Sequence, residues 1–315
     1  MNESQSAQGR YPYTPYPRGW FRVAFSDEIS PGEVKPIHYF GEELVLFRTE
    51  AGQARVFDAF CQHLGAHLGH GGTVVGESLR CPFHHWEFNG EGKCESIPYA
   101  ERIPPKAKVP CWPIIERNGI VMVYFDPAKK APDFEIPEVP EFGGEGWTTP
   151  EIAHWEVRAG WLDMNENCVD QAHFKYIHGT LSIPPTEAET QGSVHRTVSQ
   201  FRMRIPGGEG DAQLVTLDYG PGFQVVRITG LIDTVLVNTA TAIDAERTDV
   251  KFAYSVKVDG ETRKAHLAEA VIKDLRQQFE HDIPIWENKT YWSKPVLCTG
   301  DGPISNYRNW YSQFV

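Results

Sequence analysis

The residues Cys61-Gln62-His63 and, after 17 intervening residues, Cys81-Pro82-Phe83-His84 decide the fold of the first half of the chain. Each stretch pairs one cysteine with one histidine in the same order. Two thiolates and two imidazoles are the ligand set of a two-iron cluster in which cysteines hold one iron and histidines hold the other. The predicted ligands of this [2Fe–2S] cluster are Cys61, His63, Cys81 and His84.

A structural zinc site is the competing interpretation, because zinc also accepts two cysteines and two histidines. Zinc modules more often begin with two closely spaced cysteines, whereas here each loop supplies one cysteine and one histidine. The glycines at positions 65, 69, 71 and 72 also let the backbone approach a cluster closely. The iron–sulfur interpretation is therefore favoured, and zinc is the alternative to exclude.

The segment around these motifs predicts an all-β domain. Short runs rich in Val, Ile, Phe and Tyr alternate with glycine, proline and acidic turns, a pattern typical of strands. These runs are Trp20–Phe25, Val34–Phe40, Leu44–Arg48, Arg55–Phe60 and Ile120–Phe125. A proline-rich stretch from Pro127 to Pro140 has the composition of an inter-domain connection. We expect an N-terminal arm over 1–18, a cluster domain over 19–127 and a catalytic domain over 128–315.

The second part of the chain predicts strands enclosed by an early and a late helix, which is an α+β architecture. Residues 161–178 are interpreted as the early helix and residues 264–283 as the late one. The expected strands between them are Phe201–Ile205, Gln213–Tyr219, Phe223–Ile228, Val235–Ala240 and Val250–Val258.

A second group of metal-binding residues lies in the early helix, at His173 and His178. Two imidazoles and one carboxylate on one face of an iron leave positions open for dioxygen, as in non-haem ferrous oxygenases. Five residues on a helix turn the chain by about 140°, which is too far for both rings to reach one ion. The helix should therefore end or bulge between the two histidines, and Gly179 is a plausible stop.

Asp282 is the predicted third ligand of this mononuclear Fe(II). On the late helix it falls within an apolar stripe that includes Leu275 and Phe279, where an unpaired carboxylate is costly. Glu280 and Glu287 point to the opposite side. Pro284 should disturb the end of this helix. A buried salt bridge is the alternative explanation of Asp282.

Asp170 lies one turn before His173 and has two interpretations. It is either an ordinary acid on the helix surface, or a functional group that accepts the second ring N–H of His173 or links the iron to a distant electron donor. We expect the second role and count Asp170 among the catalytic residues.

Composition excludes several classes of protein. The net charge of −12, without a long basic run, argues against binding to nucleic acid and to anionic membranes. No stretch approaches the roughly 18 to 20 apolar residues of a membrane span. The first twenty residues contain no apolar core of a secretory signal, so a cytoplasmic location is expected, with six cysteines as thiols or metal ligands rather than a disulfide framework.

The two groups of motifs resemble those of one family in the expected order. CQHLGAHLGHGG (61–72) and CPFHHW (81–86) look like the cluster motif of Rieske-type non-haem iron oxygenases. DQAHFKYIH (170–178) and HDIPIW (281–286) resemble the family's iron motif and its carboxylate. Within the family, IPYAERIPP (97–105) and NYRNWYSQFV (306–315) are similar to oxygenase components of 3-ketosteroid 9α-hydroxylases. Because the chain stops at Val315, the sequence leaves open whether further residues follow.

The resemblance implies a Rieske [2Fe–2S] domain followed by a helix-grip (START-like) catalytic domain with a deep apolar pocket. It also implies a head-to-tail homotrimer in which Asp170 lies between the cluster of one subunit and the iron of the next. His85 departs from the family pattern, which usually has glycine there, and this puts the hydrogen bonding and potential of the cluster in question.

The implied activity is that of a terminal oxygenase. Electrons from NADH would arrive through a separate flavin and iron–sulfur reductase or a ferredoxin, and dioxygen would be used to hydroxylate a flat, steroid-like polycycle at an aliphatic C–H bond. The chain has no nucleotide-binding motif of its own. Apolar residues of the expected strands suit such a substrate, although each could equally be ordinary core: Val225, Val226, Ile228, Leu231, Val235 and Val237. Aromatic-ring dioxygenation, oxidative demethylation and a Rieske electron carrier without oxygenase activity are the alternatives.

Overall fold

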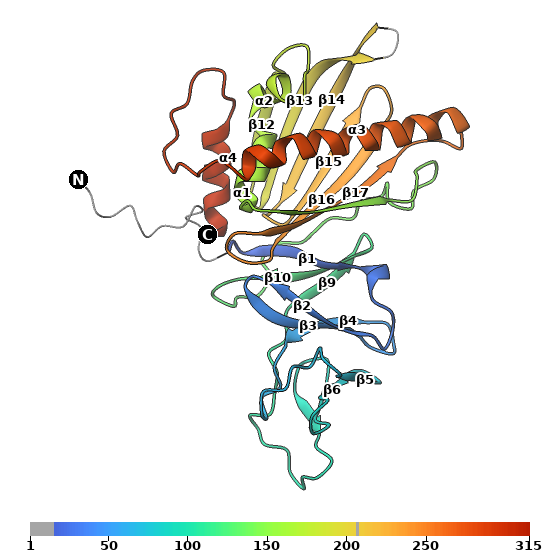
Figure 1. The fold of residues 1–315 in the computed structure, drawn as a ribbon, viewed down its shortest axis with the longest axis vertical. Helices are drawn as coiled ribbons and strands as arrows, with labels where there is room; N and C mark the ends of the chain where they lie inside the picture. Colours follow the sequence, from blue (N-terminus) through green and yellow to red (C-terminus); the bar gives the residue numbers. More distant parts are fainter. Residues whose placement is uncertain (1–15, 206–207) are drawn as a thin grey trace, which may run out of the picture. The chain divides into compact units, whose positions relative to one another are not determined.

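A computed structural model describes residues 16–205 and 208–315 of the chain (Figure 1). Most of the expected N-terminal arm, residues 1–15, lies outside the described residues. The chain divides into two compact units between Asp133 and Phe134, and the described residues up to Gly19 belong to the second unit. The division falls after the expected position at residue 127 because the first unit retains the linker: the Tyr124 hydroxyl donates to Asp133 Oδ1 at 2.7 Å.

The first unit consists of three small antiparallel sheets. One has the order β1-β10-β9, one the order β2-β3-β4, and one the order β5-β6-β7-β8. The strands are β1 (Gly19–Phe25), β2 (Val34–Tyr39), β3 (Glu42–Arg48), β4 (Ala54–Asp58), β5 (Thr73–Val75), β6 (Ser78–Arg80), β7 (Glu87–Phe88), β8 (Cys94–Ser96), β9 (Ile114–Arg117) and β10 (Ile120–Phe125). A short 3-10 helix covers Ser26–Glu28. The all-β expectation and its five strands are confirmed; the short strands β5 to β9 were not predicted, since they carry too few residues to show alternation.

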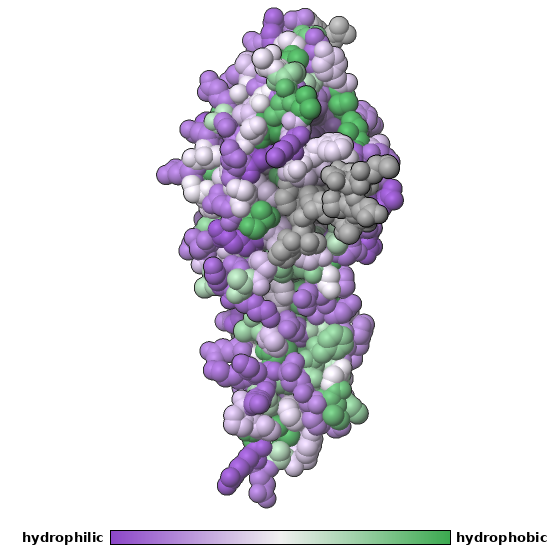
Figure 2. Space-filling model, turned by 90° about the vertical axis from the view of Figure 1, so that its left-hand side faces the viewer, coloured by the Kyte–Doolittle hydropathy of each residue, from purple (hydrophilic) through white to green (hydrophobic). Residues whose placement is uncertain are grey.

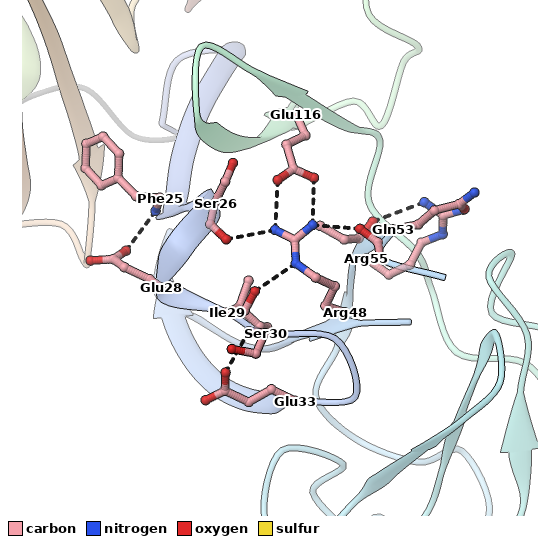
Figure 3. A network of polar contacts seen from close by, with 12 residues as sticks. Phe25, Ser26, Glu28, Ile29, Ser30, Glu33, Arg48, Gln53, Arg55 and Glu116 are labelled. Atoms are coloured by element: carbon pink, nitrogen blue, oxygen red, sulfur yellow. Dashed lines mark hydrogen bonds and ion pairs between the residues drawn. The ribbon is translucent and has the colours of Figure 1, made fainter. Parts of the chain in front are cut away.

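A buried arginine joins two of these sheets (Figure 3). The guanidinium of Arg48, on β3, donates to both carboxylate oxygens of Glu116, on β9, at 3.0 and 2.8 Å. It also donates to the carbonyl oxygens of Ile29 and Ser26 at 2.8 and 3.1 Å. A buried cation needs such partners, so this network fixes the frame on which the cluster loops are mounted. Burial alone would raise the pKa of Glu116, but the hydrogen bonds and charge of Arg48 hold that pKa below its usual value.

The second unit is a seven-stranded antiparallel sheet with one long helix across it (Figure 1). The strand order is β11-β17-β16-β15-β14-β13-β12. The strands are β11 (Glu151–Val157), β12 (Thr186–Gln191), β13 (Val194–Ile205), β14 (Gly208–Tyr219), β15 (Phe223–Thr229), β16 (Thr234–Ala242) and β17 (Thr248–Val256). The helix is α3 (Thr262–Trp286). Its apolar face packs on the inner face of the sheet, with Ala268 and Ile272 contacting a core that includes Leu236 and Tyr254. An antiparallel sheet that grips a long helix matches the expected catalytic-domain fold.

The early helix is not continuous as expected over 161–178. It consists of α1 (Trp161–Asn165), a 3-10 turn (Glu166–Cys168) and α2 (Gln171–Tyr176). The break has a local cause: Asp170 is extended, with φ −80° and ψ 98°, and its carboxylate caps α2 by accepting from the backbone N–H groups of Ala172 and His173. The predicted end before His178 is confirmed, since α2 stops at Tyr176 and Gly179 adopts a left-handed φ of 72°.

The last residues of the chain hold the start of this segment in place. Helix α4 (Ile304–Tyr311) and a 3-10 turn (Ser312–Phe314) pack in one core with Trp161. Arg308, on α4, makes a bidentate ion pair with Glu166 at 2.7 and 2.8 Å. The segment that precedes the candidate iron ligands is therefore fixed by residues near the end of the chain.

The late helix runs past its expected end. It includes Pro284 and continues to Trp286, because the proline lies in the last turn and removes only one intrahelical hydrogen bond. Among the described residues, no helix combines the length and apolarity needed to cross a membrane. The face of the molecule in Figure 2 is mostly hydrophilic, with hydrophobic residues in small separate groups.

Candidate metal centres

The two Cys/His stretches of the first unit form two loops with the same backbone pattern. The Cys61 N–H donates to the Ala66 carbonyl and the Cys81 N–H to the Trp86 carbonyl, at 2.9 and 2.8 Å. In return, the N–H four residues after each cysteine donates to that cysteine's carbonyl: Gly65 to Cys61 at 3.0 Å, and His85 to Cys81 at 3.2 Å. Each loop therefore presents one cysteine and one histidine from a turn of the same backbone geometry.

These turns bring the four predicted side chains together. The rings of His63 and His84 have centroids 4.7 Å apart, and His63 stacks on Trp86 at 4.5 Å. Cys61 and Cys81 are each 2% exposed. Burial, and to a smaller extent the neighbouring Cys81, raises the pKa of the Cys61 thiol to about 12, against the opposing hydrogen bond from the His63 backbone. Thiolates in such a place require cations beside them.

The donor set fits a Rieske cluster. Within the described part of the chain, no hydrogen-bond partner reaches the buried Nδ1 atoms of His63 and His84. Two orphaned buried nitrogens are costly unless a metal takes them. Two buried thiols opposite two such imidazoles supply the cysteine and histidine sides of the cluster. The tips of both loops are exposed and apolar, with Leu64 65% and Phe83 59% exposed.

The second unit brings His173, His178 and Asp282 together. Their ligand atoms all lie within 4.8 Å of one another. His178 Nε2 lies 3.2 Å from Asp282 Oδ2, and both side chains are more than nine-tenths buried. The two histidine rings are nearly perpendicular, with centroids 4.9 Å apart. This spacing fits two imidazoles and one carboxylate around a single ion.

The ionisation of His173 suits a ligand. Burial holds the pKa of its ring below the usual value, although the charge of Asp282 opposes this effect. A neutral imidazole is the form that binds a metal. Its Nδ1–H donates to the backbone carbonyl of Asp170 at 2.5 Å, which leaves Nε2 for the ion.

Asp170 occupies a different place from the one expected. It is the N-cap of α2 rather than a residue within a helix, and its backbone carbonyl, not its carboxylate, accepts from His173. The carboxylate Oδ2 lies 4.0 Å from His173 Nδ1, and the side chain is 36% exposed. The expected contact through the carboxylate is therefore wrong within one chain, because the capping geometry turns the carboxylate toward the backbone N–H groups.

Glu280 and Glu287 lie away from the triad, as the helical arrangement predicted. Glu280 accepts from Trp155 Nε1 at 3.2 Å, and Glu287 accepts from the Arg158 backbone N–H at 3.1 Å. Asp282 alone among these acids lines the cavity described next.

Two adjoining cavities share one residue of the triad, His178. The first, about 170 Å³, is lined by His173, His178 and Asp282. The second, about 420 Å³, shares His178 with the first and extends toward Leu231 and Val271. Both share a further set of apolar walls: Phe174, Leu214, Ile228 and Leu275. The candidate iron position therefore borders a mostly apolar space that continues from the first cavity into the second.

Of the residues expected to line the pocket, some line the cavities and others do not, and for those on strands the division follows the alternation of side chains. Val226, Ile228 and Leu231 line these cavities. Val225, Val235 and Val237 are buried and do not line either cavity, as expected for the opposite face of the same strands. The polar wall residues Gln224 and Asn238 were not predicted, since each is a single polar residue within an apolar strand.

Comparison with known families agrees with both units. Residues 19–113 match the model of the Rieske [2Fe-2S] domain, and residues 123–315 match that of the 3-ketosteroid 9alpha-hydroxylase C-terminal domain. A 3-ketosteroid-9-alpha-monooxygenase oxygenase component of Rhodococcus rhodochrous is 32% identical over 323 residues, covering 96% of this chain and 82% of its own length. A probable 3-ketosteroid-9-alpha-monooxygenase oxygenase component of the same organism is 32% identical over 325 residues, covering 95% of this chain and 80% of its own length. The cholesterol 7-desaturase nvd of Xenopus laevis is 34% identical over 332 residues, covering 95% of this chain and 72% of its own.

Solved structures share the fold. Dicamba monooxygenase bound to dicamba superposes with a TM-score of 0.76 at 18% identity, covering 94% of this chain and 96% of that one. The NdmA QL mutant of Pseudomonas putida CBB5 with theobromine has a TM-score of 0.72 at 21% identity, covering 93% and 89%.

Proposed function

The chain belongs to the Rieske-type oxygenases whose catalytic part is the 3-ketosteroid 9α-hydroxylase C-terminal domain, and from this premise we propose that it hydroxylates a steroid-like polycycle at an aliphatic C–H bond. The observation that carries the proposal is the pair of adjoining apolar cavities that meet at His178. A flat apolar substrate would extend through both cavities and present a C–H bond to the triad.

Each donor group has a role in this proposal. Cys61, His63, Cys81 and His84 hold the [2Fe–2S] cluster, and His173, His178 and Asp282 hold one Fe(II). When bound, these groups supply electrons and a site for dioxygen. The net reaction consumes the C–H substrate, one O₂, two electrons and two protons, and yields the alcohol and one water.

The residues of the chain supply position and a dry environment. The Asp170 carbonyl fixes the His173 ring, and the ends of α2 and α3 fix His178 and Asp282. The walls Leu214, Ile228 and Leu275 exclude water from the place where the C–H bond reacts.

The electron supply requires partners. A flavin and iron–sulfur reductase, or a ferredoxin, would bring electrons from NADH to the cluster, since the chain has no nucleotide-binding motif. The exposed apolar loop tips Leu64 and Phe83 beside the cluster histidines suit a surface that meets another protein. A homotrimer in which the cluster faces the Asp170 of a neighbouring subunit is the arrangement we favour. Six free cysteines are consistent with a cytoplasmic location.

Desaturation is a second candidate, because one relative of similar identity is named a cholesterol 7-desaturase. Both reactions begin at an aliphatic C–H bond. They differ in the product, since hydroxylation adds one oxygen atom and desaturation removes two hydrogens.

The test combines the purified chain with a surrogate reductase, NADH, ¹⁸O₂ and a panel of steroids. Incorporation of one ¹⁸O atom into the product supports hydroxylation. A product two mass units lighter without ¹⁸O indicates desaturation. Two incorporated oxygen atoms would indicate dioxygenation, and loss of a methyl group would indicate demethylation. Turnover of none of the steroids, together with oxidation of simple aromatic acids, would contradict the proposed substrate class.

A further inference from the structure

Four polar residues form a straight row across the inner face of the catalytic sheet. His195 pairs directly with Asp218 on the next strand, Asp218 with Gln224, and Gln224 with Asn238. The row therefore crosses β13, β14, β15 and β16 at one level. Its neighbours on the same face are the apolar walls of the first cavity, such as Val226 and Leu236. A polar row in an apolar face needs a reason.

The row begins at a fully buried acid. Asp218 and His195 are both 0% exposed. His195 Nδ1 lies 3.3 Å from Asp218 Oδ2, and the Cys168 thiol points at the same oxygen from 3.9 Å. Burial raises the pKa of Asp218, while these donors and Gln224 favour its charged form. A carboxylate that receives several donors acts as an acceptor.

The acid sets the orientation of the two amides that follow. Gln224 must turn its Nε2–H₂ group to Asp218 Oδ1, which it meets at 2.7 Å. Its oxygen then faces Asn238, whose Nδ2 donates to it at 2.7 Å. Rotation of either amide would place two acceptors, or two donors, against each other. The orientation therefore follows from the chemistry of the row, not from an assignment of oxygen and nitrogen by position alone.

This chain of donors ends at an acceptor. Asn238 lines the first cavity, beside the triad, and its Oδ1 is buried. No protein group within the described ranges donates to that oxygen. A buried oxygen with no donor is costly unless a ligand supplies one.

Resting on the proposed function, we propose that Asn238 Oδ1 receives the hydroxyl group of the substrate, so that the pocket selects a hydroxyl-bearing polycycle over the corresponding ketone. A ketone has no hydrogen to donate, so it would leave Asn238 Oδ1 without a donor. It would also place the ketone oxygen against the Asn238 oxygen, and two acceptors repel each other. The row from His195 to Asn238 thus determines specificity: His195 and Asp218 are positioning residues, and Asn238 contacts the substrate.

The test uses two steroids with the same skeleton, androstane-3β,17β-diol and androstane-3,17-dione. Binding to the holoenzyme is measured through the fluorescence of Trp161 and Trp286, which line the cavity. The wild-type chain should bind the diol about tenfold more tightly, the effect of leaving one buried acceptor unpaired. Asn238→Leu should bring the ratio of the two dissociation constants close to one.

Gln224→Met distinguishes the row from Asn238 alone. It leaves Asn238 in place but free to rotate, so the ratio should also fall toward one. Thr216→Val, which changes a wall residue outside the row, should preserve the ratio. Cluster absorbance and iron content verify that each variant is folded.

Equal or tighter binding of the dione by the wild type would overturn the inference and leave the proposed function intact. Survival of the tenfold ratio in Asn238→Leu would also overturn it. Binding of neither steroid would contradict the proposed substrate class as well, and the inference would fall with it.

Discussion

The two candidate centres obtain their ligands in opposite ways. The cluster ligands come from two short loops within residues 61–84, built on the same turn, with exposed apolar tips. The triad takes two ligands from α2 and the residues just after it and a third from α3, and all three residues line the first cavity. A centre that only passes electrons can lie near a surface, whereas one that performs chemistry must be enclosed with its substrate. Substitutions at the two centres should therefore have different effects on colour, iron content and product formation.

The largest expected effect separates the centres completely. His84→Ala should abolish the visible spectrum of the cluster, because its ring holds one iron. His173→Ala should keep the colour and the reduction by dithionite but lower product formation by at least about 100-fold, since even changes around metal ligands cost about 10- to 100-fold. Visible spectra and product yields measure both. If His173→Ala bleached the protein as fully as His84→Ala, the division into two centres would be wrong.

The assignment of Asp282 to the triad is tested by comparing two acids of helix α3. Asp282→Ala should remove most of the mononuclear iron and stop turnover, because two imidazoles alone hold the metal weakly. Glu280→Ala is the matched control, since Glu280 accepts from Trp155 Nε1 and does not line the first cavity. Iron content per cluster is the measurement. Equal iron loss in both variants would contradict the assignment of Asp282.

Asp170 tests whether the centres communicate. Asparagine caps a helix about as well as aspartate, so Asp170→Asn should leave α2 and both metals in place. An uncharged amide accepts more weakly than a carboxylate from a cluster imidazole N–H of a neighbouring subunit, so product formation should fall by roughly 100-fold. Single turnover of the pre-reduced, iron-replete variant measures this step. Cluster oxidation at the wild-type rate with a normal product yield would rule out the bridging role.

A smaller effect is expected from the ion pair between Arg48 and Glu116, which contributes to the stability of the first unit. The pKa of Glu116 is lowered in the folded state, so its pair with Arg48 stabilises the fold above the unfolded pKa and is lost as the pH falls through the folded one. Glu116→Gln should lower the free energy of unfolding by about 1 kcal/mol near neutral pH, a small value because the pair is partly exposed to solvent. In acid the two proteins should have the same free energy of unfolding. Urea unfolding followed by cluster absorbance measures it. Glu50→Gln, on the surface, is the control, and a difference that grew in acid would contradict the linkage.

The smallest effect concerns the matched turns of the cluster loops. His85 and Gly65 hold equivalent positions with left-handed φ of 57° and 76°. Replacing His85 by glycine relieves backbone strain of about 1 to 2 kcal/mol. Glycine also makes the unfolded chain more flexible, which costs about 0.4 to 1 kcal/mol, so the free energy of unfolding should rise by roughly 0.5 kcal/mol. Gly65→Ala should lose about 1 kcal/mol by strain alone, since no described atom lies within 4 Å of the added Cβ. Thermal unfolding compares the two, and a loss of stability in His85→Gly would mean that the imidazole contributes contacts of its own.

Sequence reasoning succeeded where the signal is local. The strands with alternating apolar residues, the ligand loops and the late helix with its buried Asp282 all follow from neighbouring residues. The prediction of one continuous helix over 161–178 was wrong because a single residue, Asp170, caps α2 and interrupts the helix that the neighbouring residues favour. Strand β12, with the sequence TEAETQ, lacked apolar alternation because it lies at the sheet edge. The row from His195 to Asn238 was invisible for another reason, since only strand register brings its members together.

The ion pair between Arg308 and Glu166 has a consequence for biosynthesis. The first unit has its own core and can fold while the ribosome is still making the rest, as N-terminal domains generally do. The second unit cannot fix the segment that precedes His173 until residues 304–314 have left the exit tunnel, because Tyr307 and Trp310 complete one core with Trp161 and Val169. Cluster insertion can therefore precede iron loading during synthesis. A chain shortened to end before residue 304 should therefore be coloured and reducible but unable to retain its catalytic metal.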